Sequence, residues 1–100
     1  MDLVITLNSD KVKLRNVAKA LSDNNRMEIL LSILNQNAQN LNYGGIAQKI
    51  SKSCSDVTNH MNWLKRADLI EDLNIEGKRG KMQKIPRLKY DKIVIVLNAR

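Results

Sequence analysis

Apolar positions recur along the chain with two different periods, and these periods predict the order of its elements. Residues 3–7, LVITL, form a short run with β-branched members, which is typical of a strand. A helix-like stripe follows up to residue 21, with Ser9 as its expected cap. Residues 92–97, KIVIVL, are again strongly β-prone. Unpaired strand edges invite aggregation, so we expect the two terminal strands to pair with each other or across a dimer.

The clearest helical pattern lies in residues 22–37, SDNNRMEILLSILNQN. Its main apolar stripe has members at i, i+3, i+4 and i+7, which predicts that these face the core: Met27, Leu30, Leu31 and Leu34. Ile29 and Ile33 widen the stripe, so we expect a helix that is covered on more than one side. Ser22 or Asn24 is expected to cap its start.

Two further helices are predicted between residues 43 and 67, separated by the polar turn SKS at 51–53. The first is short, about two turns by the spacing of its apolar residues, Ile46, Ala47 and Ile50. Ser53 and Asp56 form the S-x-x-D start signal of the second helix, about residues 54–67. Its expected core positions repeat at i, i+4 and i+7, namely Val57, Met61 and Leu64.

A hairpin is predicted directly after these helices. Residues 69–76 are rich in Leu and Ile, GKRG at 77–80 is a turn, and 81–88 return as a second strand. Pro86 cannot donate to a ladder, so we expect that strand to bulge or end near it.

The fold class predicted is mainly α with a small β-sheet (α+β). The order of elements is that of a winged helix-turn-helix, and 100 residues predict a single domain over 1–100.

The outer face of the predicted helix 54–67 is polar and free of acids. At about 100° per residue, four side chains point away from the core: Ser55, Asn59, Asn62 and Arg66. Asn can bridge the edge of adenine, Ser can meet several bases, and Arg pairs with guanine or a phosphate. Ser and Asn are poor helix formers, which favours a binding role over an ordinary solvated face. We predict that these four contact bases, and that Ser53 and Thr58 hold phosphates.

Positive charge is concentrated in residues 76–92. The chain has 17 basic and 10 acidic residues, a net charge of +7. This segment holds seven basic and two acidic residues (+5), whereas residues 1–75 hold nine and eight (+1). We predict a basic wing, about residues 76–84, with Lys78, Arg79 and Lys81 on the DNA backbone or in the minor groove. The alternative is a basic hairpin that only keeps a small protein in solution.

Catalytic and metal-binding chemistry find no support in the sequence. Cys54 and His60 are six residues apart, on different sides of a helix, and would lack two further zinc ligands. No nucleophile–base–acid set or phosphate loop occurs, so we expect no enzyme, metal or cofactor. His60 is expected to form a hydrogen bond within the fold. Trp63 could stack on nucleic acid, but packing under the wing or at a subunit interface is favoured.

Membrane association and secretion are not indicated either. No apolar run approaches the roughly 18 residues that would span a bilayer, and the start lacks the pattern of a signal peptide. A single cysteine fits a reducing compartment. We expect a cytoplasmic protein.

Three blocks of the sequence resemble ArsR-type winged-helix repressors. LSDNNRMEILLSIL (21–34) resembles their LSD-P-x-R-x-x-IL-x-x-L signature, and GGIAQKISKSCSDVTNHMNWLKRADLIE (44–71) resembles their helix-turn-helix. GKRGKMQKIPRLKYDKIVIVL (77–97) is similar to the tail of one subgroup. The resemblance implies a homodimer that binds a near-palindromic operator and represses transcription. The family's metal-sensing Cys-x-Cys pair is absent from NYGGIA, and Asp68 stands where the family has Gly.

The function predicted is therefore that of a sequence-specific, dimeric regulator whose partner is double-stranded DNA. Two alternatives use the same surfaces. A nonspecific architectural protein would bind DNA with little preference among sequences. A winged-helix module that binds RNA or protein would show no appreciable affinity for duplex DNA.

Overall fold

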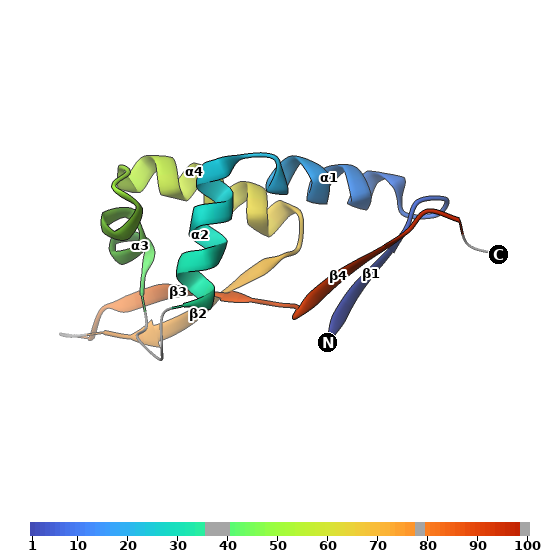
Figure 1. The fold of residues 1–100 in the computed structure, drawn as a ribbon. Coiled ribbons are helices and arrows are strands. Elements are labelled where there is room, and N and C mark those ends of the chain that lie inside the picture. Colours follow the sequence, from blue (N-terminus) through green and yellow to red (C-terminus); the bar gives the residue numbers. More distant parts are fainter. Residues whose placement is uncertain (36–40, 78–79, 99–100) are drawn as a thin grey trace.

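The computed structural model describes residues 1–35, 41–77 and 80–98. Four helices lie between a first strand and three last ones: β1 (Asp2–Thr6), α1 (Lys11–Leu21), α2 (Asn24–Leu34), α3 (Tyr43–Ile50), α4 (Cys54–Arg66), β2 (Ile70–Glu76), β3 (Met82–Leu88) and β4 (Lys92–Val96). The molecule is elongated, with α3 and the far end of the β2–β3 hairpin at one end (Figure 1). The β1–β4 pair and both termini lie at the other end.

The strands form two separate two-stranded sheets. β2 and β3 pair antiparallel from Ile70↔Leu88 to Glu76↔Met82, as the predicted hairpin requires. β1 and β4 pair in parallel from Asp2↔Lys92 to Thr6↔Val96. Parallel strands need a long connection, and here nearly the whole chain supplies it. The terminal strands therefore pair with each other, which confirms the first of the two predicted arrangements.

The buried core joins α4 to the elements around it. All three core positions predicted for α4, Val57, Met61 and Leu64, are fully buried. They pack with residues of every other helix and of strands β1 and β2. The pattern of apolar residues therefore placed the inner face of α4 correctly, and its outer face follows from the same geometry.

The predicted inner face of α2 is wrong except at Leu30, which is half-buried against the core. Ile29 and Ile33 are buried, whereas Met27, Leu31 and Leu34 are 44%, 48% and 64% exposed. Apolar residues surround most of this helix, so periodicity alone cannot choose which side meets the core. Contacts with α3 and α4 made that choice, and they left a second apolar face of α2 uncovered.

Two of three predictions about the ends of elements are wrong. Asp23, rather than Ser22 or Asn24, caps α2 by accepting hydrogen bonds from two backbone N–H groups. Ser9 does not cap α1: Asp10 occupies that position and makes no side-chain capping bond. β3 does not bulge at Pro86, which pairs in register with Asp72, but it ends two residues later, at Leu88, as the second predicted alternative has it. In a two-stranded ribbon each strand has one free edge, where a missing N–H has no consequence.

Both helices of the helix-turn-helix end without glycine. Ser51 after α3 and Asp68 after α4 take left-handed backbone conformations, with φ of 59° and 63°. In each case the next amide reaches back five residues, Lys52 to Ala47 and Leu69 to Leu64. This is the pattern in which glycine is usual because it has no Cβ.

Candidate nucleic-acid interface

The start of each helix in the pair α3–α4 is fixed by a side-chain cap. The Asn42 carboxamide oxygen accepts from the Gly45 amide at 2.8 Å, and the Ser53 hydroxyl accepts from the Asp56 amide at 3.1 Å. The second bond confirms the start signal read from the sequence. Each cap satisfies an amide that the helix itself cannot pair. The Ser53 cap holds the α4 side of the turn at residues 51–53, and the bond from the Lys52 amide to the Ala47 carbonyl holds its α3 side.

The outer face of α4 is open to solvent. The four side chains predicted to contact bases, Ser55, Asn59, Asn62 and Arg66, are all exposed along one side of the helix. No acid lies among them, since Asp56 falls on the flank. The structure thus brings the four together on an uncovered surface.

The residues predicted to contact phosphates differ in how free their side chains are to do so. Ser53 is exposed, and its hydroxyl lies 3.3 Å from that of Ser55. The Thr58 hydroxyl donates to the Cys54 carbonyl at 2.9 Å, so it would have to rotate before it could donate to a phosphate. Lys81 is exposed at the start of the returning hairpin segment. Lys78 and Arg79 lie outside the described residues.

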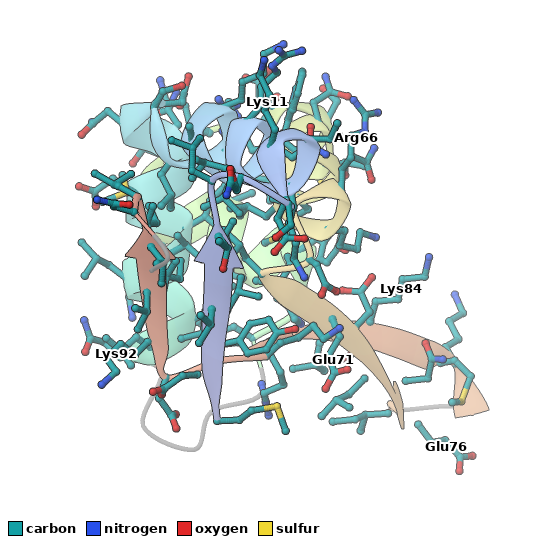
Figure 2. The ribbon with its side chains drawn as sticks, turned by 90° about the vertical axis from the view of Figure 1, so that its right-hand side faces the viewer. Lys11, Arg66, Glu71, Glu76, Lys84 and Lys92 are labelled. Carbon is teal, nitrogen blue, oxygen red and sulfur yellow. The ribbon has the colours of Figure 1, made fainter. Side chains whose placement is uncertain are left out.

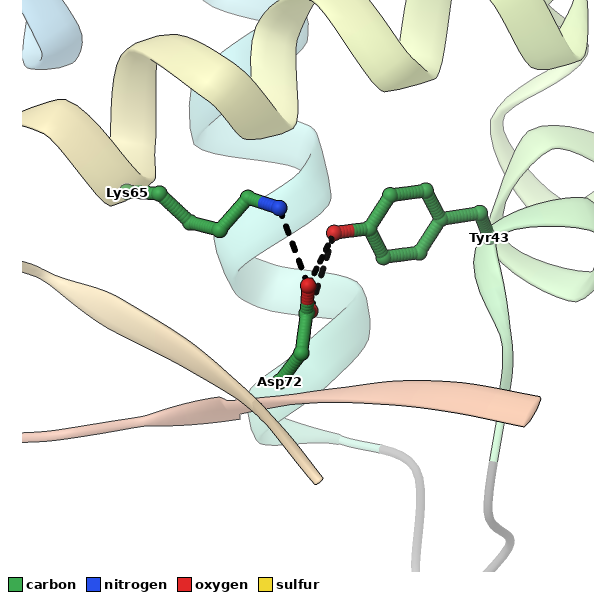
Figure 3. A network of polar contacts seen from close by, with 3 residues as sticks. All are labelled: Tyr43, Lys65 and Asp72. Carbon is green, nitrogen blue, oxygen red and sulfur yellow. Dashed lines mark hydrogen bonds and ion pairs between the residues drawn. The ribbon is translucent and has the colours of Figure 1, made fainter. Parts of the chain in front are cut away.

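A network of three side chains joins the hairpin to α3 and α4 (Figure 3). Asp72 on β2 accepts from the Tyr43 hydroxyl at 2.8 and 2.9 Å and from the Lys65 ammonium at 2.9 Å. The Asp72 side chain is only 13% exposed. Because hydrogen bonds to a charged group are stronger than neutral ones, this network holds the hairpin at a set position beside α4.

The charges in this network suit neutral pH. Burial raises the pKa of the Tyr43 phenol above its ordinary value, so the hydroxyl remains a donor. The hydrogen bond to Asp72 raises the pKa of Lys65 above 10.5. A lysine whose pKa is higher in the folded state stabilises the fold below about pH 10.5. The contribution is lost only as the pH rises through the pKa of that lysine in the folded protein.

Trp63 lies half-buried among three cations and not under the hairpin, which was one of its two predicted positions; the other, at a subunit interface, stays a prediction. Its ring centre is 4.9 Å from the Arg66 guanidinium, 5.6 Å from that of Arg26 and 5.9 Å from the Lys19 ammonium. A cation over the face of an indole ring is attracted electrostatically by the negative face of that ring. The ring therefore joins the exposed side of α4 to the end of α1 and the start of α2.

Arg26 ties these three helices together. Its guanidinium donates to the carbonyls of Ala20 and Lys19, at 2.7 and 2.8 Å, near the end of α1. A third nitrogen lies 3.2 Å from Nδ1 of His60 on α4, which confirms the hydrogen bond expected for that histidine. Cationic groups at a helix C-terminus are favourable because they meet unpaired carbonyls.

Sequence reasoning missed Tyr43, Asp72, Lys65, Lys19 and Arg26. The contacts of the first three join residues up to 29 positions apart, for which no periodicity gives a signal. The basic residues of α1 were visible as Lys11, Arg15 and Lys19, but the near balance of charge over residues 1–75 concealed them.

Within the described residues no three potential ligands gather that could hold a metal ion, and Cys54 is exposed. No helix in those ranges is long and apolar enough to cross a bilayer.

Comparison with solved structures identifies the arrangement. Reduced HlyU from Vibrio cholerae N16961 superposes with a TM-score of 0.65 at 21% identity, over 85% of this chain and 81% of that one. NolR from Sinorhizobium fredii gives 0.64 at 18% identity, over 84% and 76%. The chain has a winged helix-turn-helix fold. The β2–β3 hairpin is its wing, and α4 stands in the position of the recognition helix. No protein family model and no curated protein sequence matches the chain.

Proposed function

We propose that this protein is a sequence-specific DNA-binding regulator of transcription. α4 enters the major groove, where Ser55, Asn59, Asn62 and Arg66 read base edges, and the wing follows the phosphate backbone. The observation that carries the proposal is the exposed, acid-free outer face of α4. The fold shared with HlyU and NolR supports it, as does the net charge of +7.

The braced hairpin adds a mechanical argument. Base contacts specify a sequence only when backbone contacts hold the helix in register. The Asp72 network fixes the wing relative to α4, so phosphate contacts by residues such as Lys81 would set the register of the base-reading face. Two loosely joined surfaces would bind DNA, but they would discriminate less between sequences.

We further propose that the regulator acts as a homodimer and a repressor. Dimerisation is supported by the uncovered apolar face of α2, formed by Met27, Leu31 and Leu34. That face continues into Tyr90 and Ile93, which line the same groove. A second copy would cover it, and a twofold complex would read a near-palindromic site. The proposal of repression rests on the resemblance to ArsR-type proteins. A promoter–reporter assay measures whether the protein lowers or raises transcription from its target promoter.

The decisive experiment is selection of bound duplexes from a random-sequence library, followed by competition. A specific regulator prefers its selected site over random duplex by at least about a thousandfold. Asn59→Ala should reduce that preference roughly 5- to 150-fold, equivalent to about 1–3 kcal/mol for one base contact. Asn98→Ala, at another exposed asparagine far along the chain, is the matched control and should leave it unchanged.

Two outcomes would overturn the proposal. Tight binding without preference among duplexes would identify an architectural protein instead. Absence of duplex binding at moderate salt would favour a module that binds RNA or protein.

A further inference from the structure

Helix α1 carries a row of positive charge that the base-reading and wing surfaces do not include. Lys11, Arg15 and Lys19 are spaced at i, i+4 and i+8, and all three are exposed. They lie opposite the buried Val17 and Ala20. Residues 11–21 hold four basic residues and no acid, so this helix alone contributes +4. We call these three side chains the α1 basic row.

Both ends of the row lie beside the C-terminal part of α4. Lys19 is over the Trp63 ring, which also lies close to the guanidinium groups of Arg66 and Arg26. Lys11 lines the same polar cleft as Arg66, together with Asn16. In Figure 2, Arg66 lies between Lys11 above it and Lys84 on the wing below it, whereas Lys92 is at the opposite lower edge. The recognition helix thus has a cationic surface on each side.

The charges of the row are available to a ligand. Within the described residues, the side chains of Lys11 and Arg15 form no ion pair or hydrogen bond. Of the two acids in the shared cleft, Asp68 accepts from Lys89 and Tyr90, and Asp10 accepts weakly from the Thr6 amide at 3.4 Å. Other lysines of this protein, such as Lys65, are neutralised by a carboxylate.

We propose that the α1 basic row is a second phosphate-binding surface for duplex DNA, on the far side of α4 from the wing. The row spans about 12 Å along the helix axis, the rise of roughly three to four base pairs. It would hold the backbone that flanks the segment read by α4. A membrane surface fits poorly, because Val17 and Ala20 of α1 are buried in the core and Val12 is the only large apolar side chain that this helix leaves exposed. This inference rests on the proposed function.

The test is the salt dependence of binding to a 40-base-pair duplex selected by the wild-type protein. The logarithm of affinity falls with the logarithm of salt concentration by about 0.9 for each phosphate contact. The triple variant Lys11→Gln/Arg15→Gln/Lys19→Gln should therefore flatten this slope by about 2.7, with an unchanged circular dichroism spectrum. Its preference for the selected sequence over random duplex should change less than that of Asn59→Ala.

A matched pair of single variants separates local contact from overall charge. Lys11→Gln and Lys92→Gln each remove one exposed lysine charge; that of Lys92 lies 3.5 Å from the Asp2 carboxylate on the β1–β4 sheet. We expect only Lys11→Gln to flatten the slope, by about 0.9. If the wild type binds its duplex and the triple variant keeps the full slope, or if Lys92→Gln has the same effect as Lys11→Gln, the basic row is not a DNA contact while the proposed function stands. If the wild type binds no duplex, both fail.

Discussion

At the scale of single residues, Asp68 shows how a side chain replaces what glycine would provide. Its left-handed backbone is strained for a residue with a Cβ. The carboxylate accepts from the Lys89 ammonium at 2.5 Å and the Tyr90 hydroxyl at 3.0 Å. These bonds fasten the end of α4 to the segment between β3 and β4. We infer that the ion pair offsets the backbone strain.

The Asp68 ion pair makes part of the stability depend on acid pH. The hydrogen bond from Lys89 lowers the pKa of Asp68 below its ordinary value of 3.8. A carboxyl group whose pKa is lower in the folded state stabilises the fold at any pH above its pKa in the unfolded chain. This contribution disappears as the pH falls through its pKa in the folded chain. Asp68→Asn should therefore be less stable than wild type at pH 7, and the difference should shrink below about pH 3.8.

Urea denaturation at several pH values between 3 and 7 measures this difference. The comparison must be between the two proteins at each pH, because the pKa values of Asp23 and Asp91 are lowered as well and affect both equally. A difference in unfolding free energy that stays constant over the range would show that the Asp68 charge contributes nothing.

At the scale of elements, the wing depends on one carboxylate for its attachment to the helices. Asp72 is the shared acceptor for Tyr43 of α3 and Lys65 of α4. The ammonium of Lys65 also lies 5.6 Å from the Tyr43 ring centre. Removing the acceptor would leave a half-buried ammonium and hydroxyl without their partner, which costs more than the bonds alone contribute.

Asp72→Ala should accordingly lower the free energy of unfolding by about 1–3 kcal/mol. Glu71→Ala, at the neighbouring exposed position on the same strand, is the control and should change it by less than about 0.5 kcal/mol. Urea denaturation followed by circular dichroism makes the comparison. Equal stability of the two variants would mean that the network does not hold the wing.

At the scale of the whole molecule, two features leave the single chain incomplete. The α2 face of Met27, Leu31 and Leu34 is uncovered. The β1–β4 sheet has only two strands, although parallel sheets are normally buried on both faces. Val4 and Ile95 of that sheet are also about half exposed. A second copy of the chain would bury such surfaces, as the proposed homodimer requires.

Leu34→Lys tests this arrangement. Placing a charge in the proposed interface should convert a dimer to a monomer, because an unpaired charge there is costly to bury. Leu73→Lys changes another exposed leucine, on the wing, and should leave the dimer intact. Sedimentation equilibrium measures the mass of each. A monomeric wild type, or a dimer unaffected by Leu34→Lys, would place the α2 face outside any interface.

Local patterns determined much of this protein. Periodicity identified every helix and strand of the described residues to within a few positions, and it identified the inner face of α4 through Val57, Met61 and Leu64. Since the two sides of a helix are fixed together, the same pattern placed Asn59 and Arg66 on its outer side. These features were predictable because each depends on residues close together in the chain.

Contacts between distant segments decided the rest. Which apolar side of α2 is buried was settled by packing against α3 and α4, since Leu31 and Ile33 are equally apolar. The Asp72 network, the parallel pairing of β1 with β4, and the position of Lys11 and Lys19 beside α4 all join segments remote in sequence. The hydrophobic effect is non-directional, so the sequence indicates only that an apolar side chain should be buried. Which neighbouring residues cover that side chain is decided by the tertiary structure.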